Sequence, residues 1–230
     1  VLKLLRFISS IDTSNVRYMN GMFDGCTNLE EINLSNFNTS SVTEIMWMFQ
    51  KCSKIKTLDL SSFDMSKVVN ASCMFFNCEA LVFVKFNNSN KMSEVLDISQ
   101  LFYNCQQLSS VDLSFIYSSK ITHMQDMFYN CMSIKAIDMQ NLNTISVINM
   151  DNIFVLNYNL QFLNIYSFVS NNNIQYDIIL GVLPYNLIYC LKDYEQTQDL
   201  ILNFNIKYSK NNCTYICNYE NKKIINETNS

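Results

Sequence analysis

Apolar residues recur along this chain in one pattern that repeats about every 26 residues. Each copy contains a phenylalanine, and in the first five copies a cysteine follows it three residues later. The phenylalanines are Phe23, Phe49, Phe75, Phe102, Phe128 and Phe154, and the cysteines are Cys26, Cys52, Cys78, Cys105 and Cys131, with Asn157 in the sixth place. The steps between the phenylalanines are 26, 26, 27, 26 and 26 residues. Such self-similarity at a fixed period indicates stacked repeats.

Each copy predicts two secondary-structure elements. After the cysteine, apolar residues alternate with a polar one, as in Leu58-Asp59-Leu60, which is the period of a short β-strand. Before the phenylalanine, apolar residues step by three and four, which predicts one face of a short α-helix. A serine precedes the helical stretch, as Ser40 and Ser66 do, and predicts an N-cap that accepts an unpaired backbone N–H.

The predicted fold is an α/β solenoid with one copy of the repeat per coil. A single strand and helix cannot bury their apolar faces alone, whereas stacked copies cover one another. We expect a parallel sheet on the concave side, short helices on the convex side, and core packing for the phenylalanine and methionine columns. The solenoid is predicted to span residues 1–173, and residues 174–230 are predicted to form a small C-terminal cap with a polar tail that contains cysteine.

The consensus of these columns, MFxxCxxLxxLDLSxFxTSxVxxM, resembles the BspA-type leucine-rich repeat, a 26-residue repeat of bacterial surface proteins that also occurs in protist surface proteins. The resemblance covers about residues 14–168. It implies an extracellular or cell-surface protein that functions in adhesion or in host and matrix binding. It brings no shared enzymatic activity and no cofactor.

Composition narrows the function classes. The net charge of −4 provides no basic stripe for nucleic acid. One histidine and three glycines disfavour histidine-based hydrolysis and a glycine-rich phosphate loop. The longest apolar stretch, residues 178–191, is too short for a membrane span and contains Pro184 and Asn186. We therefore expect a non-enzymatic protein with no cofactor, no nucleic-acid partner and no membrane span in this chain.

The nine cysteines form two groups. The five that belong to the repeat are predicted to be buried free thiols, and Cys73 is predicted to be exposed or half-buried. Three more, Cys190, Cys213 and Cys217, lie beyond the repeat in a segment typical of secreted modules. We expect one disulfide there, between Cys190 and either Cys213 or Cys217.

The strand face is the predicted ligand-binding surface, because solenoids usually bind on a concave sheet. Its polar residues stand at the middle of each strand, and its aromatic residues are expected to be exposed contacts. The alternative is plain solvation of a repeated polar position. The candidates are Asn33, Asp59, Phe83, Lys85, Asp112, Asp138, Phe162, Asn164 and Tyr166.

Glycosylation and self-assembly are further expectations. Four N-x-S/T triplets fall in turns or in the polar tail, at Asn38, Asn87, Asn212 and Asn226, although chance alone would produce about as many triplets as the chain contains. The expected partner is a protein or glycan ligand. Residues 1–11 carry no recognisable cap, which favours a fibre built by head-to-tail packing as the second hypothesis. An intracellular scaffold is the third, and it predicts nine free thiols and no glycans.

Overall fold

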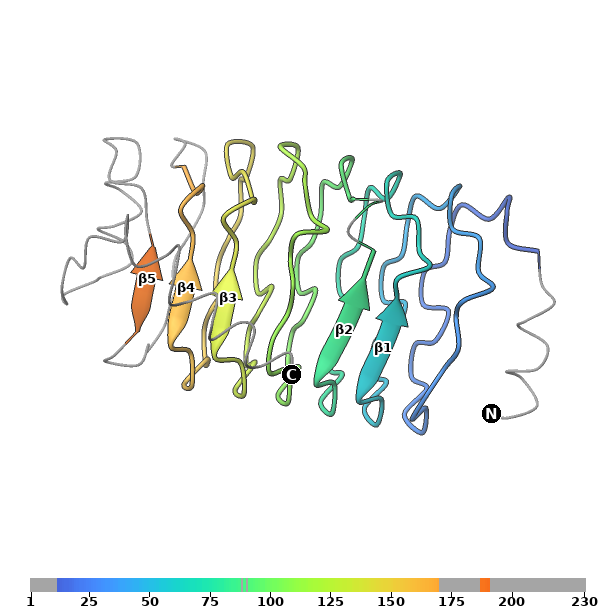
Figure 1. Ribbon diagram of the computed structural model, residues 1–230, viewed down its shortest axis with the longest axis horizontal. Helices are drawn as coiled ribbons and strands as arrows, with labels where there is room; N and C mark the ends of the chain where they lie inside the picture. Colours follow the sequence, from blue (N-terminus) through green and yellow to red (C-terminus); the bar gives the residue numbers. More distant parts are fainter. Residues whose placement is uncertain (1–11, 88, 90, 170–186, 191–230) are drawn as a thin grey trace.

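The computed structural model describes residues 12–87, 89, 91–169 and 187–190. There the chain winds into coils that lie side by side along the long axis of the molecule (Figure 1). The predicted stack of repeats with parallel strands is confirmed. The strands are β1 (Thr57–Leu60), β2 (Phe83–Phe86), β3 (Ala136–Asp138), β4 (Phe162–Asn164) and β5 (Ile188–Cys190).

The register of the strands follows the repeat. β1 pairs with β2 in parallel, with Leu58 opposite Val84. β4 pairs in parallel with β3 on one side and with β5 on the other, so that Leu163 faces both Ile137 and Tyr189. Each pair joins residues 26 positions apart. One strand per repeat is therefore enough to build a continuous edge-to-edge ladder.

The ladder is interrupted between β2 and β3. Residues 108–113, where the pattern predicts a fourth strand, form no strand, although Val111 and Leu113 are buried as expected. The break lies beside the corner that carries the one extra residue of the repeat. There Met92 pairs with Ile116, an offset of 24 residues, whereas neighbouring bridges such as Asp97 with His123 have an offset of 26.

The expected helices are absent from the described residues, and this part of the prediction is wrong. The stretch around each phenylalanine forms consecutive turns instead. In the second coil the N–H of Gln50 bonds to the carbonyl of Trp47 (3.0 Å), whereas the N–H groups of Trp47 and Phe49 bond to Ser72 (3.1 Å) and Met74 (2.9 Å) in the next coil. A helix of so few residues is marginal by itself. The turns give successive N–H groups partners alternately within and between coils, and they also place residues i and i+3 on one side.

Two residues in each coil adopt a left-handed backbone, two positions before and two positions after the phenylalanine. The first coil uses Gly21 and Gly25 (φ 61° and 69°), whereas later coils use other residues with φ between 55° and 66°. Asparagine at several of these sites confirms its expected role in bends, but Trp47 and Leu156 also adopt this conformation, which costs a residue with a Cβ about 1 kcal/mol. The non-glycine residues are Trp47, Lys51, Cys73, Asn77, Gln100, Asn104, Asp126, Asn130, Asn152 and Leu156.

The core is a stack of phenylalanine rings, which confirms the packing role predicted for this column. The rings of Phe49 and Phe75 are 5.8 Å apart between centroids and 5° from parallel. The third coil has Ser89 where the first two place a second phenylalanine (Phe37 and Phe63). Phe86 and Phe115 fill that place, with centroids 3.7 Å apart.

The serines predicted as helix N-caps belong to corners of the coil, and this prediction is also wrong. The N–H and hydroxyl of Ser66 both donate to Oδ1 of Asp64, at 3.0 and 2.7 Å. Ser40 donates in the same way to Asn38. These are Asx turns, in which a side-chain carboxylate or amide closes the bend in place of a backbone carbonyl.

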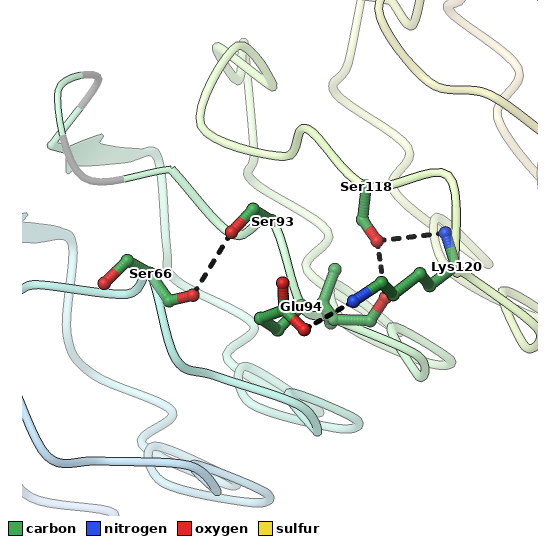
Figure 2. A network of polar contacts seen from close by, with 6 residues as sticks. Ser66, Ser93, Glu94, Ser118 and Lys120 are labelled. Atoms are coloured by element: carbon green, nitrogen blue, oxygen red, sulfur yellow. Dashed lines mark hydrogen bonds and ion pairs between the residues drawn. The ribbon is translucent and has the colours of Figure 1, made fainter.

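Polar contacts at the surface also link successive coils (Figure 2). The hydroxyl of Ser93 donates to the carbonyl of Ser66 (3.3 Å), and Lys120 forms an ion pair with Glu94 (2.6 Å). The Ser118 hydroxyl accepts from the N–H of Lys120 (3.1 Å). Because the ion pair is half-exposed, it contributes little to stability, and burial of the stacked apolar columns contributes most of it.

Candidate recognition surfaces

The cysteine column forms a ladder of buried thiols, as predicted. Each thiol donates to the carbonyl oxygen of the phenylalanine one coil earlier rather than to another sulfur. The Sγ of Cys78 lies 3.0 Å from the oxygen of Phe49, and the Sγ of Cys105 lies 3.2 Å from that of Phe75. Equivalent bonds are made by Cys52 and Cys131.

Burial makes these thiols poor nucleophiles. Desolvation raises the pKa of Cys52 from its ordinary value of 9.0 to about 12. The pKa values of Cys78, Cys105 and Cys131 are raised further, again chiefly by desolvation. The thiolate is the reactive form of cysteine, so the ladder is structural at neutral pH.

The remaining cysteines differ in exposure. Cys26, in the first described coil, is a free exposed thiol, and Cys73 is half-buried as predicted. Cys190 is buried at the end of β5. Cys213 and Cys217 lie outside the described residues, so the disulfide remains a prediction.

The middle positions of the strands make Asx turns. Oδ1 of Asp59 accepts from the N–H (2.9 Å) and hydroxyl (2.5 Å) of Ser61, and Oδ2 lies 3.2 Å from Nζ of Lys85 on β2. These donors, the Ser61 hydroxyl first, lower the pKa of Asp59. The polar column therefore shapes the corner after each strand, whatever else it does. The same turn, with the N–H two residues on as donor, forms at Asn33, Asp112, Asp138 and Asn164.

The aromatic part of the predicted strand-face site is only partly exposed. Phe162 and Asn164 on β4 are 1% and 4% exposed, so the prediction that they present themselves to a ligand is wrong. Phe83 is half-buried, and Tyr166 is exposed. Asp138 and Asn164 occupy neighbouring places in the register of β3 and β4. The candidate residues do not form one open patch.

The predicted glycosylation sites coincide with corners of the coil. Asn38 is exposed and Asn87 is half-buried, and the Oδ1 of each closes an Asx turn with the serine two residues on. The N-x-S triplets of the solenoid are therefore explained by the turn chemistry alone. Asn212 and Asn226 lie outside the described residues.

A different surface, not predicted from the sequence, lies over the consecutive turns, residues 44–51, 70–77, 97–104, 123–130 and 149–156, and we call it the turn face. Three aromatic side chains, Phe76, Tyr103 and Tyr129, each follow a core phenylalanine directly and stack outside the core. Their ring centroids are 4.6 and 4.8 Å apart, and all three are half-buried. The signal that could have revealed them is the dipeptides Phe-Phe, Phe-Tyr and Phe-Tyr in three successive copies.

Polar ladders flank this aromatic stack. Nδ2 of Asn104 donates to Asn77 (3.0 Å), and Nδ2 of Asn130 donates to Asn104 (2.6 Å). On the other side, Nε2 of Gln100 donates to Oδ2 of Asp126 (3.2 Å). Turns join the two sides, because the N–H of each aromatic residue bonds to the carbonyl three residues back. The turn face thus presents aromatic, amide and carboxylate groups in register from coil to coil.

The electrostatics of the turn face are negative around its centre. Desolvation raises the pKa of Tyr103, and the neighbouring Tyr129 and Asp126 raise it further. His123 is half-buried, with Nδ1 2.9 Å from the hydroxyl of Thr122. Within the described part of the chain there is no group of three potential metal ligands and no helix able to cross a bilayer.

The stacked coils, their phenylalanine and cysteine ladders and the parallel strands define a repeat protein of the solenoid class. The chain belongs to the family described as "Mycoplasma protein of unknown function, DUF285", whose model matches residues 3–114 and 96–176. Neither the curated proteins nor the solved structures include a significant match to the chain.

Proposed function

We propose that this protein is a non-enzymatic recognition and adhesion module of a cell-surface or secreted protein, related to the BspA-type leucine-rich repeats. One observation carries the proposal. Phe76, Tyr103 and Tyr129 form an aromatic ladder outside the core, at positions where the first two coils carry Asp24 and Gln50 and remain folded. Half-buried tyrosines at a surface are favoured contacts in protein interfaces.

The hydrogen bonding of the coils supports recognition through side chains. In the turn face the backbone N–H groups bond alternately to the same coil and to the next, as Tyr103 does to Gln100 and Phe102 does to Met127. A partner strand therefore finds few free N–H groups there, and affinity has to come from side chains. The protonated thiols of the cysteine ladder support the non-enzymatic part of the proposal.

Binding of the purified full chain to immobilised extracellular-matrix proteins and to a panel of glycans tests this function. Saturable binding that a Phe76→Ser/Tyr103→Ser/Tyr129→Ser variant loses is the expected result. A matched control variant carries Phe83→Ser on the strand face. Absence of saturable binding to every matrix protein and glycan would contradict the recognition role.

The extracellular placement has its own test. We expect the natively produced chain, alkylated without reduction, to show blocked thiols among Cys190, Cys213 and Cys217 and to lose mass on removal of glycans. Nine alkylated thiols and an unchanged mass would instead favour an intracellular scaffold.

The fibre hypothesis is the second candidate, and what favours it is the coil-on-coil packing itself, because a terminal coil exposes core to a further copy. Its proposed contact, residues 1–11, lies outside the described residues. Light scattering over a range of concentrations tests it: a fibre subunit grows with concentration, whereas a constant monomer mass would exclude it.

A further inference from the structure

The turn face of coils three to six carries acidic groups and neither lysine nor arginine. The segments 70–77, 97–104, 123–130 and 149–156 contain Asp97, Asp126 and Asp151. In coils four and five the carboxylate of Asp126 lies in the same turns as two tyrosines. A surface of this composition attracts positive charge and repels phosphate, nucleic acid and acidic lipid.

Hydrogen-bond acceptors at the centre of this surface lack donors among the described residues. Oδ2 of Asp126 accepts from Gln100, while Oδ1 has no hydrogen-bond partner in that part of the chain. The hydroxyls of Tyr103 and Tyr129 likewise make no hydrogen bond there, and both side chains are only half-buried. These three residues belong to adjacent coils, so their free oxygens are presented together. A guanidinium or ammonium group, which carries several donors and a charge, complements them.

An open aromatic ring lies on the same column of the repeat. Trp47 stands two residues before Phe49, as Asp126 does before Phe128, and it is 42% exposed. The rings of Phe76, Tyr103 and Tyr129 cover one another's faces, whereas the described chain stacks no aromatic ring on the indole. An exposed tryptophan face is the strongest cation–π site available to a protein.

The backbone shows that these side chains are displayed at a conformational cost. Trp47 and Asp126 have φ of 57° and 56°, in the left-handed region, where the first coil uses Gly21. A Cβ at Gly21 would meet only Cβ of Asp24, at 3.7 Å, so the position accepts a side chain but does not require one. Strained residues that the fold itself does not need point to a role in binding.

We propose that the turn face docks an extended, basic segment of a protein partner, with one basic side chain at Asp126, Tyr103 and Tyr129 and another on Trp47. Three coil steps of about 4.8 Å separate Trp47 from Asp126 along the stack, about 14 Å, which an extended peptide spans in about four residues. The partner segment therefore carries arginine or lysine at positions i and i+4. This inference rests on the proposed recognition function and names the partner of one surface.

Fluorescence anisotropy with the full chain and a labelled peptide tests the proposal. The probe is a glycine- and serine-rich peptide with two arginines four positions apart, and the comparison peptide carries glutamates in their place. We expect saturable binding of the arginine peptide alone, weakened by added salt because the contacts are charged. Equal binding of the two peptides, or no binding of either, would overturn the proposal.

Variants locate the site. Asp126→Asn is expected to weaken binding about tenfold, the loss typical of one charge-assisted contact, and Trp47→Ala and Tyr103→Phe/Tyr129→Phe severalfold. The matched control is Asp59→Asn on β1, which removes the same charge and keeps its Asx turn, as Asn33 does. It should change binding less than twofold. An equal effect of Asp59→Asn and Asp126→Asn would mean attraction to net charge only, and the site would be wrong.

The same variants separate this inference from the proposed function. If the full chain binds matrix proteins or glycans and Asp126→Asn leaves both that binding and the peptide affinity unchanged, the docking site is wrong and the recognition function stands. If the arginine peptide binds at Asp126 but no matrix protein or glycan is bound, the docking site stands and the adhesive role fails. Thermal unfolding of each variant confirms that it remains folded.

Discussion

The thiol of Cys78 donates to the carbonyl oxygen of Phe49, one coil earlier, across 3.0 Å. The same carbonyl accepts the N–H of Cys52 at 3.1 Å, so one oxygen joins a turn within its own coil to the side chain of the next coil. The two most regular columns of the sequence are thus coupled. The phenylalanines fill the core, and the cysteines tie each phenylalanine backbone to its neighbour.

Replacing Cys78 by alanine is expected to lower the free energy of unfolding by about 1–2 kcal/mol, because a buried hydrogen bond and some packing are lost while the carbonyl of Phe49 keeps its other donor. Urea denaturation measures the change. Cys26→Ala at the exposed end of the ladder is the control and should cost less than about 0.5 kcal/mol. Equal costs at the two sites would mean that the thiol bond contributes nothing.

Alkaline pH is expected to weaken the fold through the cysteine ladder. Burial raises the pKa of Cys52 from 9.0 to about 12, so the folded state holds its proton more tightly than the unfolded chain. This contribution is fully present below pH 9 and is lost as the pH rises from 9 towards 12. The stability difference between the wild type and Cys52→Ala, measured at a series of pH values, should shrink over that range. A constant difference would show that the thiol does not titrate differently on folding.

Relief of backbone strain can be measured at Leu156, which has φ of 66°. Leu156→Gly and Leu156→Ala both remove the side chain, but only glycine adopts this conformation freely. The glycine variant is therefore expected to be more stable than the alanine variant by about 1 kcal/mol. Val155→Gly against Val155→Ala, at the preceding position, which does not have a positive φ, provides the control and should show the opposite order.

The ring pair of Phe86 and Phe115 replaces the phenylalanine that the third coil lacks. Phe115→Ala is expected to lower the free energy of unfolding by about 3–5 kcal/mol, because the ring is buried and no neighbouring coil fills its place. A double-mutant cycle with Phe86→Leu should show a coupling of at least about 0.5 kcal/mol. Additive effects would mean that the two rings pack independently.

Some elements were predictable because they depend on the side-chain pattern alone. The alternation of Leu58, Asp59 and Leu60 is a strand period, and these residues form β1 with the expected inward and outward faces. The phenylalanine and cysteine columns are buried as predicted, since a residue repeated at a fixed step occupies the same place in every coil. Column identity therefore carries from sequence to structure directly.

Other elements were not predictable because two structures share one apolar pattern. Ile45, Met48 and Phe49 step by three and four, which fits both a helix and consecutive turns. The choice depends on where the N–H groups find acceptors, and Trp47 bonds to Ser72 in the next coil. The candidate site failed for the same reason: Phe162 stands at a strand position that alternation places outside the core, yet the folded protein buries it.

The sequence by itself determined the repeat, its 26-residue step, the composition of the core and the parallel direction of the strands, because stacking identical units in register allows only that arrangement. Tertiary structure decided what lies between the strands and which surface is presented. Hydrogen bonds between coils replaced the helices by turns, and these turns brought Tyr103, Asp126 and Tyr129 together. No local pattern contains that outcome, since the partners of these backbone groups lie a full coil away.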